Sequence, residues 1–122
     1  MMDGADAIGR IMGLEPEVAY ETLVANYGRD IADDVIGIGR IWNRPGLTRR
    51  ERSFVALAAL TTLGTKERLR LHIGGALKHG ATREEIEEVI LTLMVYAGHA
   101  RATEAIEVAR EVFRERGLLT RD

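Results

Sequence analysis

Residues 68–89 read RLRLHIGGALKHGATREEIEEV, and this stretch decides the fold because it holds the end of one helix and the start of the next. Gly80 is predicted to end the first helix, since glycine adopts the left-handed backbone conformation without a Cβ penalty. Thr82 and Glu85 have the spacing of a capping box at the start of the second helix. The stretch therefore predicts two consecutive helices joined by a tight turn.

His72 is the candidate functional residue of this stretch. It shares a helical face with Leu69, Ile73 and Ala76, so its imidazole is predicted to point toward the packed side, where it can exchange a proton near neutral pH. A hydrogen-bonded core histidine is the structural alternative. His79 lies about 10.5 Å further along the helix axis, too far for both imidazoles to bind one metal ion directly. The sequence predicts no metal site.

Length and composition limit the classes of protein that this chain can belong to. Its 122 residues fit a single domain, 1–122, without disulfide staples. The absence of cysteine excludes thiolate metal sites, cysteine nucleophiles and dithiol redox chemistry. Seventeen basic and nineteen acidic side chains are interspersed and leave a net charge of −2, which does not resemble a nucleic-acid footprint. With no membrane-length apolar run and no signal peptide, we expect a soluble, cytoplasmic protein.

The rest of the chain shows helical periodicity and no alternating strand pattern, which predicts an all-α fold of about six helices. A short N-terminal amphipathic helix is predicted over 3–13, and residues 1–14 are left open as an N-terminal arm. The further predicted helices span 16–27, 30–42, 49–63, 66–79, 83–97 and 100–116.

The central segment predicts a turn and, after it, a helix that is apolar on nearly all sides. Residues 43–47, Asn-Arg-Pro-Gly-Leu, predict a turn, and Thr48 with Glu51 predicts a second capping box. The following helix is apolar on nearly all sides from Phe54 to Leu63. One small subunit has too little mass to cover such a helix, so we expect a homo-oligomer.

Several short segments follow one another in a recognisable order and spacing. They are 39–47 (GRIWNRPGL), 52–53 (RS), 71–72 (LH), 84–89 (EEIEEV) and 96–98 (YAG), together with Ala76, Gly80 and Ala102. In this arrangement residues 35–115 resemble the carboxymuconolactone decarboxylase family. The resemblance implies an AhpD-like helical fold, assembly as trimers or hexamers, and no cofactor in the decarboxylase branch of the family.

The chain departs from the family pattern at two places near the expected site. Peroxidase-type members carry Cys-x-x-Cys-x-x-x-His, and the cysteine positions are Thr65 and Arg68 here, so a cysteine-based peroxidase is excluded. Arg68 also stands where decarboxylase-type members usually carry a glutamate. The usual Tyr-Cys-Gly-x-Pro segment reads Tyr-Ala-Gly-His-Ala at 96–100.

The resemblance implies a carbon-carbon lyase, a carboxy-lyase that removes carbon dioxide from 4-carboxymuconolactone or a related small anionic lactone. Such a site must bind carboxylates, stabilise an enolate oxygen and return a proton to carbon. The candidates are His72 as proton donor, Arg44 and Arg52 for carboxylates, Trp42 and Tyr96 as walls, and Arg68 and His99 as additional positive charge.

Structural roles remain open for these residues. Trp42 also fits a core position, Arg52 also fits pairing with Glu51 or a neighbour, and the acidic cluster 84–88 fits a solvated face near a helix N-terminus. Two other functions also stay open: a different small-molecule enzyme on the same scaffold, and a non-catalytic helical oligomeric binding module.

Overall fold

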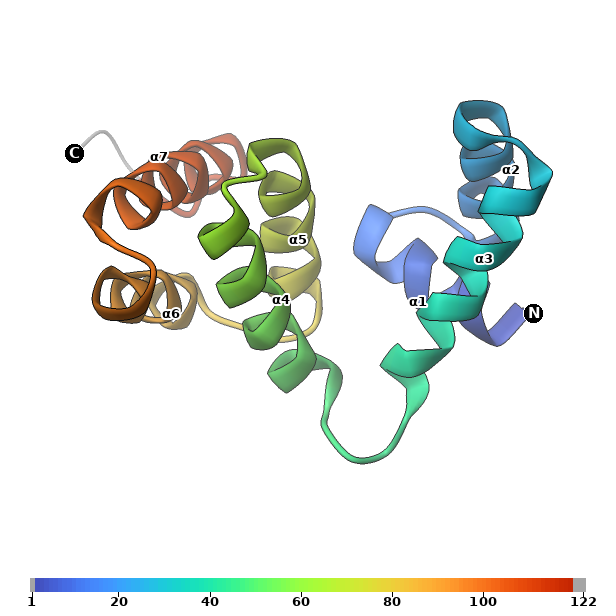
Figure 1. Cartoon of the computed structure of the whole chain (residues 1–122), viewed down its shortest axis with the longest axis horizontal. Coiled ribbons are helices and arrows are strands. Elements are labelled where there is room, and N and C mark those ends of the chain that lie inside the picture. The colour runs from blue at the N-terminus through green and yellow to red at the C-terminus, as the bar shows by residue number, and fades with distance from the viewer. Residues whose placement is uncertain (1, 120–122) are drawn as a thin grey trace.

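The computed structural model describes residues 2–119, and all the regular structure in this part of the chain is helical (Figure 1). The elements are α1 (Met2–Met12), α2 (Pro16–Tyr27), α3 (Arg29–Gly39), the 3-10 helix η1 (Arg40–Asn43), α4 (Arg49–Leu63), α5 (Lys66–Lys78), α6 (Arg83–Tyr96) and α7 (His99–Glu115). The predicted all-α class, an AhpD-like helical fold, is confirmed. Within residues 2–119, no helix has the length and apolar character needed to cross a membrane.

The helices form two groups joined by the turn before α4 (Figure 1). Helices α4 to α7 enclose the larger core, whose fully buried side chains include Leu57, Ile73, Ile86 and Phe113. Helices α1 to α3 enclose a smaller core around Ala32. Helix α5 belongs to the first group but also packs against α1, so the two groups meet along these two helices.

Helix α1 packs into the bundle along its length. Its side chains Ala5, Ala7 and Ile11 are buried. On α5, a Cβ added to Gly75 would lie 3.4 Å from the Ile11 Cα, so the glycine lets the two backbones approach closely. The segment that the sequence left open as an arm is thus a helix held against α3 and α5.

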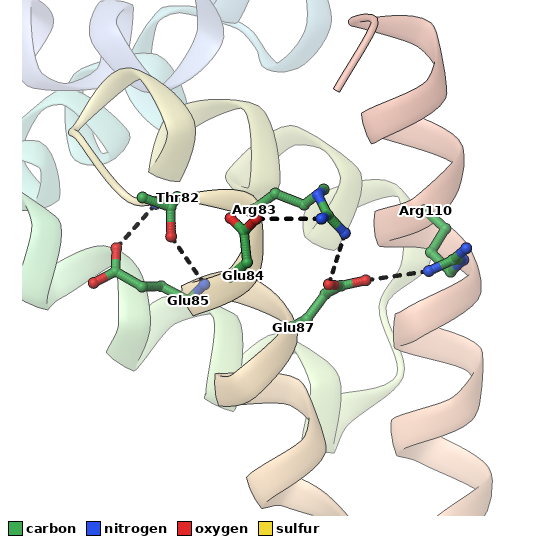
Figure 2. Close-up of polar contacts among 6 residues, drawn as sticks. All are labelled: Thr82, Arg83, Glu84, Glu85, Glu87 and Arg110. Atoms are coloured by element: carbon green, nitrogen blue, oxygen red, sulfur yellow. Dashed lines mark hydrogen bonds and ion pairs between the residues drawn. The ribbon is translucent and has the colours of Figure 1, made fainter. Parts of the chain in front are cut away.

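The two capping boxes predicted from sequence are confirmed. The Thr82 hydroxyl accepts from the Glu85 backbone N–H at 3.1 Å, and the Glu85 carboxylate accepts from the Thr82 N–H at 2.9 Å (Figure 2). Thr48 and Glu51 make the same pair of bonds at the start of α4. Gly80 has φ of +97°, as predicted for the residue that lets the chain turn after α5.

One carboxylate of the acidic cluster at the start of α6 ties two helices together. Glu87 accepts from Arg83 at 3.0 Å and from Arg110 of α7 at 3.4 Å (Figure 2). Glu84 and Glu88 are exposed, as the solvated-face interpretation predicts. The cluster therefore serves capping and helix packing in the structure.

The α-helix before the turn at 44–48 ends earlier than the single helix predicted over 30–42. Helix α3 ends at Gly39 and continues as the 3-10 helix η1, which carries Trp42. A Cβ on Gly39 would lie 2.7 Å from the Gly4 carbonyl oxygen of α1, so only glycine permits this close approach. The change from α-helix to 3-10 helix occurs at this contact, and the 3-10 helix η1 carries Trp42.

Candidate functional site

A pocket of about 380 Å³ lies where α5 meets the α1–α3 group, and His72 is one of its walls. Most of the lining is apolar and comes from α1, α2 and α3. The lining residues are Ile8, Ile11, Met12, Leu23, Asn26, Tyr27, Val35, Ile38, Trp42, Arg68, Leu71 and His72. We call this the His72 pocket. Its size suits a small organic molecule, and its polar groups are few.

The imidazole of His72 is half-buried in this pocket. Burial lowers the pKa of His72 below its ordinary value, and the positive charge of Arg68 lowers it further. Both effects disfavour the imidazolium, so the neutral form of His72 is favoured at pH 7. A bound anion would act in the opposite direction and favour the protonated form.

Arg68 brings a guanidinium to the same pocket. It lies one helical turn before His72 on α5, so the two side chains project from the same face of the helix. Its Nη2 donates to the Tyr27 hydroxyl of α2 at 3.0 Å, which orients the guanidinium across the gap between the two helix groups. Of the arginines predicted as site residues, Arg68 is the one that lines the His72 pocket.

The Trp42 indole lies close to two imidazole rings. Its ring centroid lies 6.2 Å from that of His72 and 5.6 Å from that of His79, with interplanar angles of 35° and 37°. The indole also lines a second cavity of about 190 Å³, together with Arg52 and Val55. We call this the Arg52 cavity. Trp42 is thus a wall of both the His72 pocket and the Arg52 cavity.

The two arginines predicted to bind carboxylates, Arg44 and Arg52, do not line the His72 pocket. Arg52 lines the Arg52 cavity. Its Nη2 donates to the Arg44 backbone carbonyl at 3.1 Å, so its pairing within the described residues is with a neighbour. The Glu51 carboxylate accepts from the Thr48 N–H in the capping box.

Tyr96 and His99 lie at another part of the fold. Tyr96 ends α6 with 80% of its surface exposed, and His99 begins α7. The α6–α7 turn is on the side of the α4–α7 group that faces away from α1–α3 (Figure 1). Within one chain these two side chains are therefore separate from His72, and their predicted part in substrate binding stays a prediction.

Sequence reasoning missed the pocket residues contributed by the N-terminal helices. Asn26 and Tyr27 end α2 and reach the pocket only because α1–α3 fold back onto α5. No local signal marks them. The pairing of Ser53 with His79, whose Oγ and Nδ1 are 2.9 Å apart, was likewise missed because 26 positions separate the two residues.

Possible metal-ligating side chains do not cluster in the described part of the chain. Residues 2–119 contain no group of three or more histidine, cysteine, aspartate or glutamate side chains arranged to hold an ion. The fold and site together define an all-α protein with a small, mainly apolar pocket that holds one imidazole and one guanidinium.

Comparison with known proteins places this arrangement in a family. Residues 37–111 match the model of the carboxymuconolactone decarboxylase family, and the chain belongs to that family. The predicted resemblance is confirmed.

Three relatives show how far the similarity extends. The chain is 40% identical over 80 residues to a 4-carboxymuconolactone decarboxylase of Acinetobacter baylyi, an alignment that covers 66% of this chain and 60% of the relative. It is 35% identical over 77 residues to the nitrosuccinic acid decarboxylase npaB of Metarhizium robertsii, covering 63% of this chain and 54% of the relative. An uncharacterised 15.0 kDa protein of Paracoccus denitrificans is 31% identical over 99 residues, which cover 80% of this chain and 72% of that protein. The chain therefore spans a little over half of the first two relatives.

Proposed function

We propose that this protein is a carboxy-lyase acting on a small anionic substrate, with 4-carboxymuconolactone as the first candidate. The observation that carries the proposal is the His72 pocket, in which an imidazole and a guanidinium lie one helical turn apart among apolar side chains. Membership of the carboxymuconolactone decarboxylase family supports it, as does the similarity to two proteins named as decarboxylases.

The proposed reaction breaks the bond between a carboxylate and its carbon. Carbon dioxide leaves, and the electron pair delocalises through the conjugated system onto the lactone carbonyl oxygen. A proton is then delivered to carbon, so the product has gained one proton and lost carbon dioxide. The substrate supplies its own electron sink, and this chemistry requires no metal or thiamine.

Arg68 and His72 would have separate roles in this reaction. Arg68 would bind a carboxylate, since a guanidinium offers two parallel N–H donors to two oxygens. His72 would acquire a proton as the anion binds, because the bound charge raises the pKa that burial and Arg68 hold low. The imidazolium would then act as general acid toward the carbanionic carbon. Trp42 would close one wall of the pocket against water.

A second substrate follows from the relative named nitrosuccinic acid decarboxylase. Loss of a carboxylate beside a nitro group leaves the electron pair on the nitro oxygens, so the protein has the same tasks as with a lactone. Arg68 would bind the remaining carboxylate, and His72 would return the proton. Nitrosuccinic acid is therefore the substrate to test beside 4-carboxymuconolactone.

The active assembly is proposed to be a homo-oligomer, either a trimer or a hexamer. Helix α4 leaves Val55 and Leu63 exposed by 61% and 65%, and α6 leaves Val95 exposed by 78%. Burial of such side chains against a second copy would remove apolar surface from water. Contact between subunits is also the way in which Tyr96 and His99 would reach a substrate.

The experiment that tests the proposed function measures carbon dioxide release from each substrate by the purified protein. We expect turnover of at least one of them, with loss of the conjugated chromophore when 4-carboxymuconolactone reacts. A folded, oligomeric protein that releases carbon dioxide from neither substrate would contradict the proposal.

A further inference from the structure

Trp42 lines two cavities. It forms part of the wall of the His72 pocket of about 380 Å³ and of the Arg52 cavity of about 190 Å³. A side chain beside a cavity has no partner atoms on that side and loses the dispersion contacts that a filled core would give. Its orientation therefore depends on the groups that do touch it, and two of these are the rings of His72 and His79.

The backbone that carries Trp42 gives it little additional support. Trp42 belongs to a four-residue 3-10 helix, η1, with no side-chain cap, and the chain leaves it through the exposed turn at 44–48. Short 3-10 helices have poorer hydrogen-bond geometry than α-helices. Side-chain contacts must therefore fix the indole more than the local backbone does.

His79 is itself held in place by a buried hydroxyl. Ser53 of α4 is 2% exposed, and its Oγ lies 2.9 Å from His79 Nδ1. The Nε2 atom of His79 is buried and makes no hydrogen bond within the described residues 2–119. The bond to Ser53 is therefore the polar contact that sets the rotation of the imidazole. It also links α4 to the end of α5.

Burial and the neighbouring groups keep the imidazole of His79 mainly neutral. Burial lowers the pKa of His79, and the neighbouring groups lower it further: Arg49 on α4, Arg10 on α1, and His72 and Lys78 on α5. Within the described residues, the bond between its Nδ1 and the Ser53 Oγ is the polar contact that orients the ring. His79 lines neither the His72 pocket nor the Arg52 cavity, so it is placed to support Trp42 and not to meet a substrate.

We infer that His79 is a positioning residue: hydrogen-bonded to Ser53, it holds the Trp42 indole where that ring lines both the His72 pocket and the Arg52 cavity. The inference rests on the proposed function only in taking the His72 pocket as the substrate site. With this support in place, a substrate in the His72 pocket meets Arg68 and His72 beside a fixed wall. Without it, the indole moves toward one of the two cavities, and the shape of the His72 pocket changes.

The consequence for catalysis is specific. A pocket wall that moves lets the substrate shift relative to the His72 imidazole; a full displacement of about 1 Å can cost about a hundredfold in rate, and a smaller one costs less. The carboxylate contact with Arg68 is made from α5 and does not pass through Trp42, so binding is affected less. Loss of the support should therefore lower kcat more than it raises KM.

The test uses Trp42 as its own reporter, since the chain contains one tryptophan. Ser53→Ala removes the hydrogen bond and leaves both rings, whereas His79→Ala removes the supporting ring. Lys78→Ala is the matched control, because Lys78 precedes His79 on α5 and is exposed. Acrylamide quenching of Trp42 fluorescence is measured in each protein without substrate, after circular dichroism and light scattering have established fold and assembly.

We expect Ser53→Ala and His79→Ala to raise the acrylamide quenching constant about twofold or more, because an indole that leaves a half-buried seat is open to collisions with solvent. Lys78→Ala should match the parent. With 4-carboxymuconolactone, the first two variants should lower kcat about tenfold while KM changes by about twofold or less.

Folded Ser53→Ala and His79→Ala proteins with parental quenching would overturn the inference. If His79→Ala does not fold, His79→Phe replaces it, since phenylalanine fills the ring volume but cannot bond to Ser53. Parental quenching in that variant would also overturn the inference. The fluorescence measurement needs no substrate, so a failure of the proposed decarboxylation would not be confused with a failure of the positioning role.

Discussion

Replacing Arg68 by glutamine tests which of the two cavities lined by Trp42 binds the substrate carboxylate. Arg68 lines the His72 pocket and is oriented by the Tyr27 hydroxyl at 3.0 Å, whereas Arg52 lines the Arg52 cavity. Glutamine keeps a polar side chain and a good helix former but removes the charge and the guanidinium fork. Arg52→Gln is the matched control, with the same chemical change in the Arg52 cavity.

The expected size of the effect follows from the exposure of Arg68. A hydrogen bond to a charged group contributes about 1.5–3 kcal/mol, which converts to about 10- to 140-fold in KM or Kd. Arg68 is exposed, and solvent screening weakens charge interactions at such positions. We therefore expect the lower part of the range, about a tenfold rise in KM for 4-carboxymuconolactone, with a smaller effect at high salt.

A second readout of the same variant does not depend on turnover. The charge of Arg68 is one of the two causes that lower the pKa of His72, so Arg68→Gln should raise that pKa while burial continues to hold it down. Titration of the histidine ring protons by NMR measures this directly in a protein with three histidines. Arg52→Gln should leave the His72 titration unchanged.

The assay is steady-state decarboxylation followed through the conjugated chromophore, at two salt concentrations. If Arg52→Gln raises KM while Arg68→Gln leaves KM at the parental value, the substrate carboxylate binds in the Arg52 cavity. The assignment of Arg68 would then be wrong.

Three further predictions concern stability and assembly. Folding lowers the pKa values of His72 and His79, so below about pH 6.5 the folded state binds fewer protons than the unfolded chain. Tm should therefore be highest above that pH and fall on acidification. His72→Gln should weaken this dependence in thermal melts, and a Tm that rises on acidification would contradict it. Phe113→Ala should cost about 3–5 kcal/mol in chemical denaturation, since Phe113 is fully buried, whereas a loss under about 1 kcal/mol would show that the α4–α7 core is not packed as described. Light scattering at low micromolar concentration should give the mass of a trimer or hexamer, and a stable monomer would remove the oligomer from the proposed function.

The helices and their ends could be predicted because their causes are local. Thr82, Glu85 and Gly80 act within one turn of chain, and the structure forms the bonds and the positive φ that their spacing indicates. The apolar spacing of α6 and α7 was similarly sufficient. The exception lies at Gly39, where a contact with the Gly4 carbonyl of α1 accompanies the change from α-helix to 3-10 helix.

The candidate site could be predicted only in part. His72 was predicted because its helical face and the family resemblance both pointed to it; it lines a pocket, and its catalytic role stays a prediction. Which arginine accompanies it could not be read from sequence, since Arg52 and Arg68 line different cavities, and the position of Trp42 depends on η1 and on contacts with α5. The walls from α1 to α3 were missed for the same reason: they reach His72 through tertiary packing alone.

The role of His72 is tested most directly by carbon dioxide release from 4-carboxymuconolactone by the parent and by His72→Gln, compared at equal assembly and fold. Glutamine is a good helix former and remains polar, so α5 and the bundle should persist. The account predicts a loss of turnover of about a hundredfold or more, the usual scale for a general acid. A folded His72→Gln protein that releases carbon dioxide at the parental rate would show that His72 is not the proton donor.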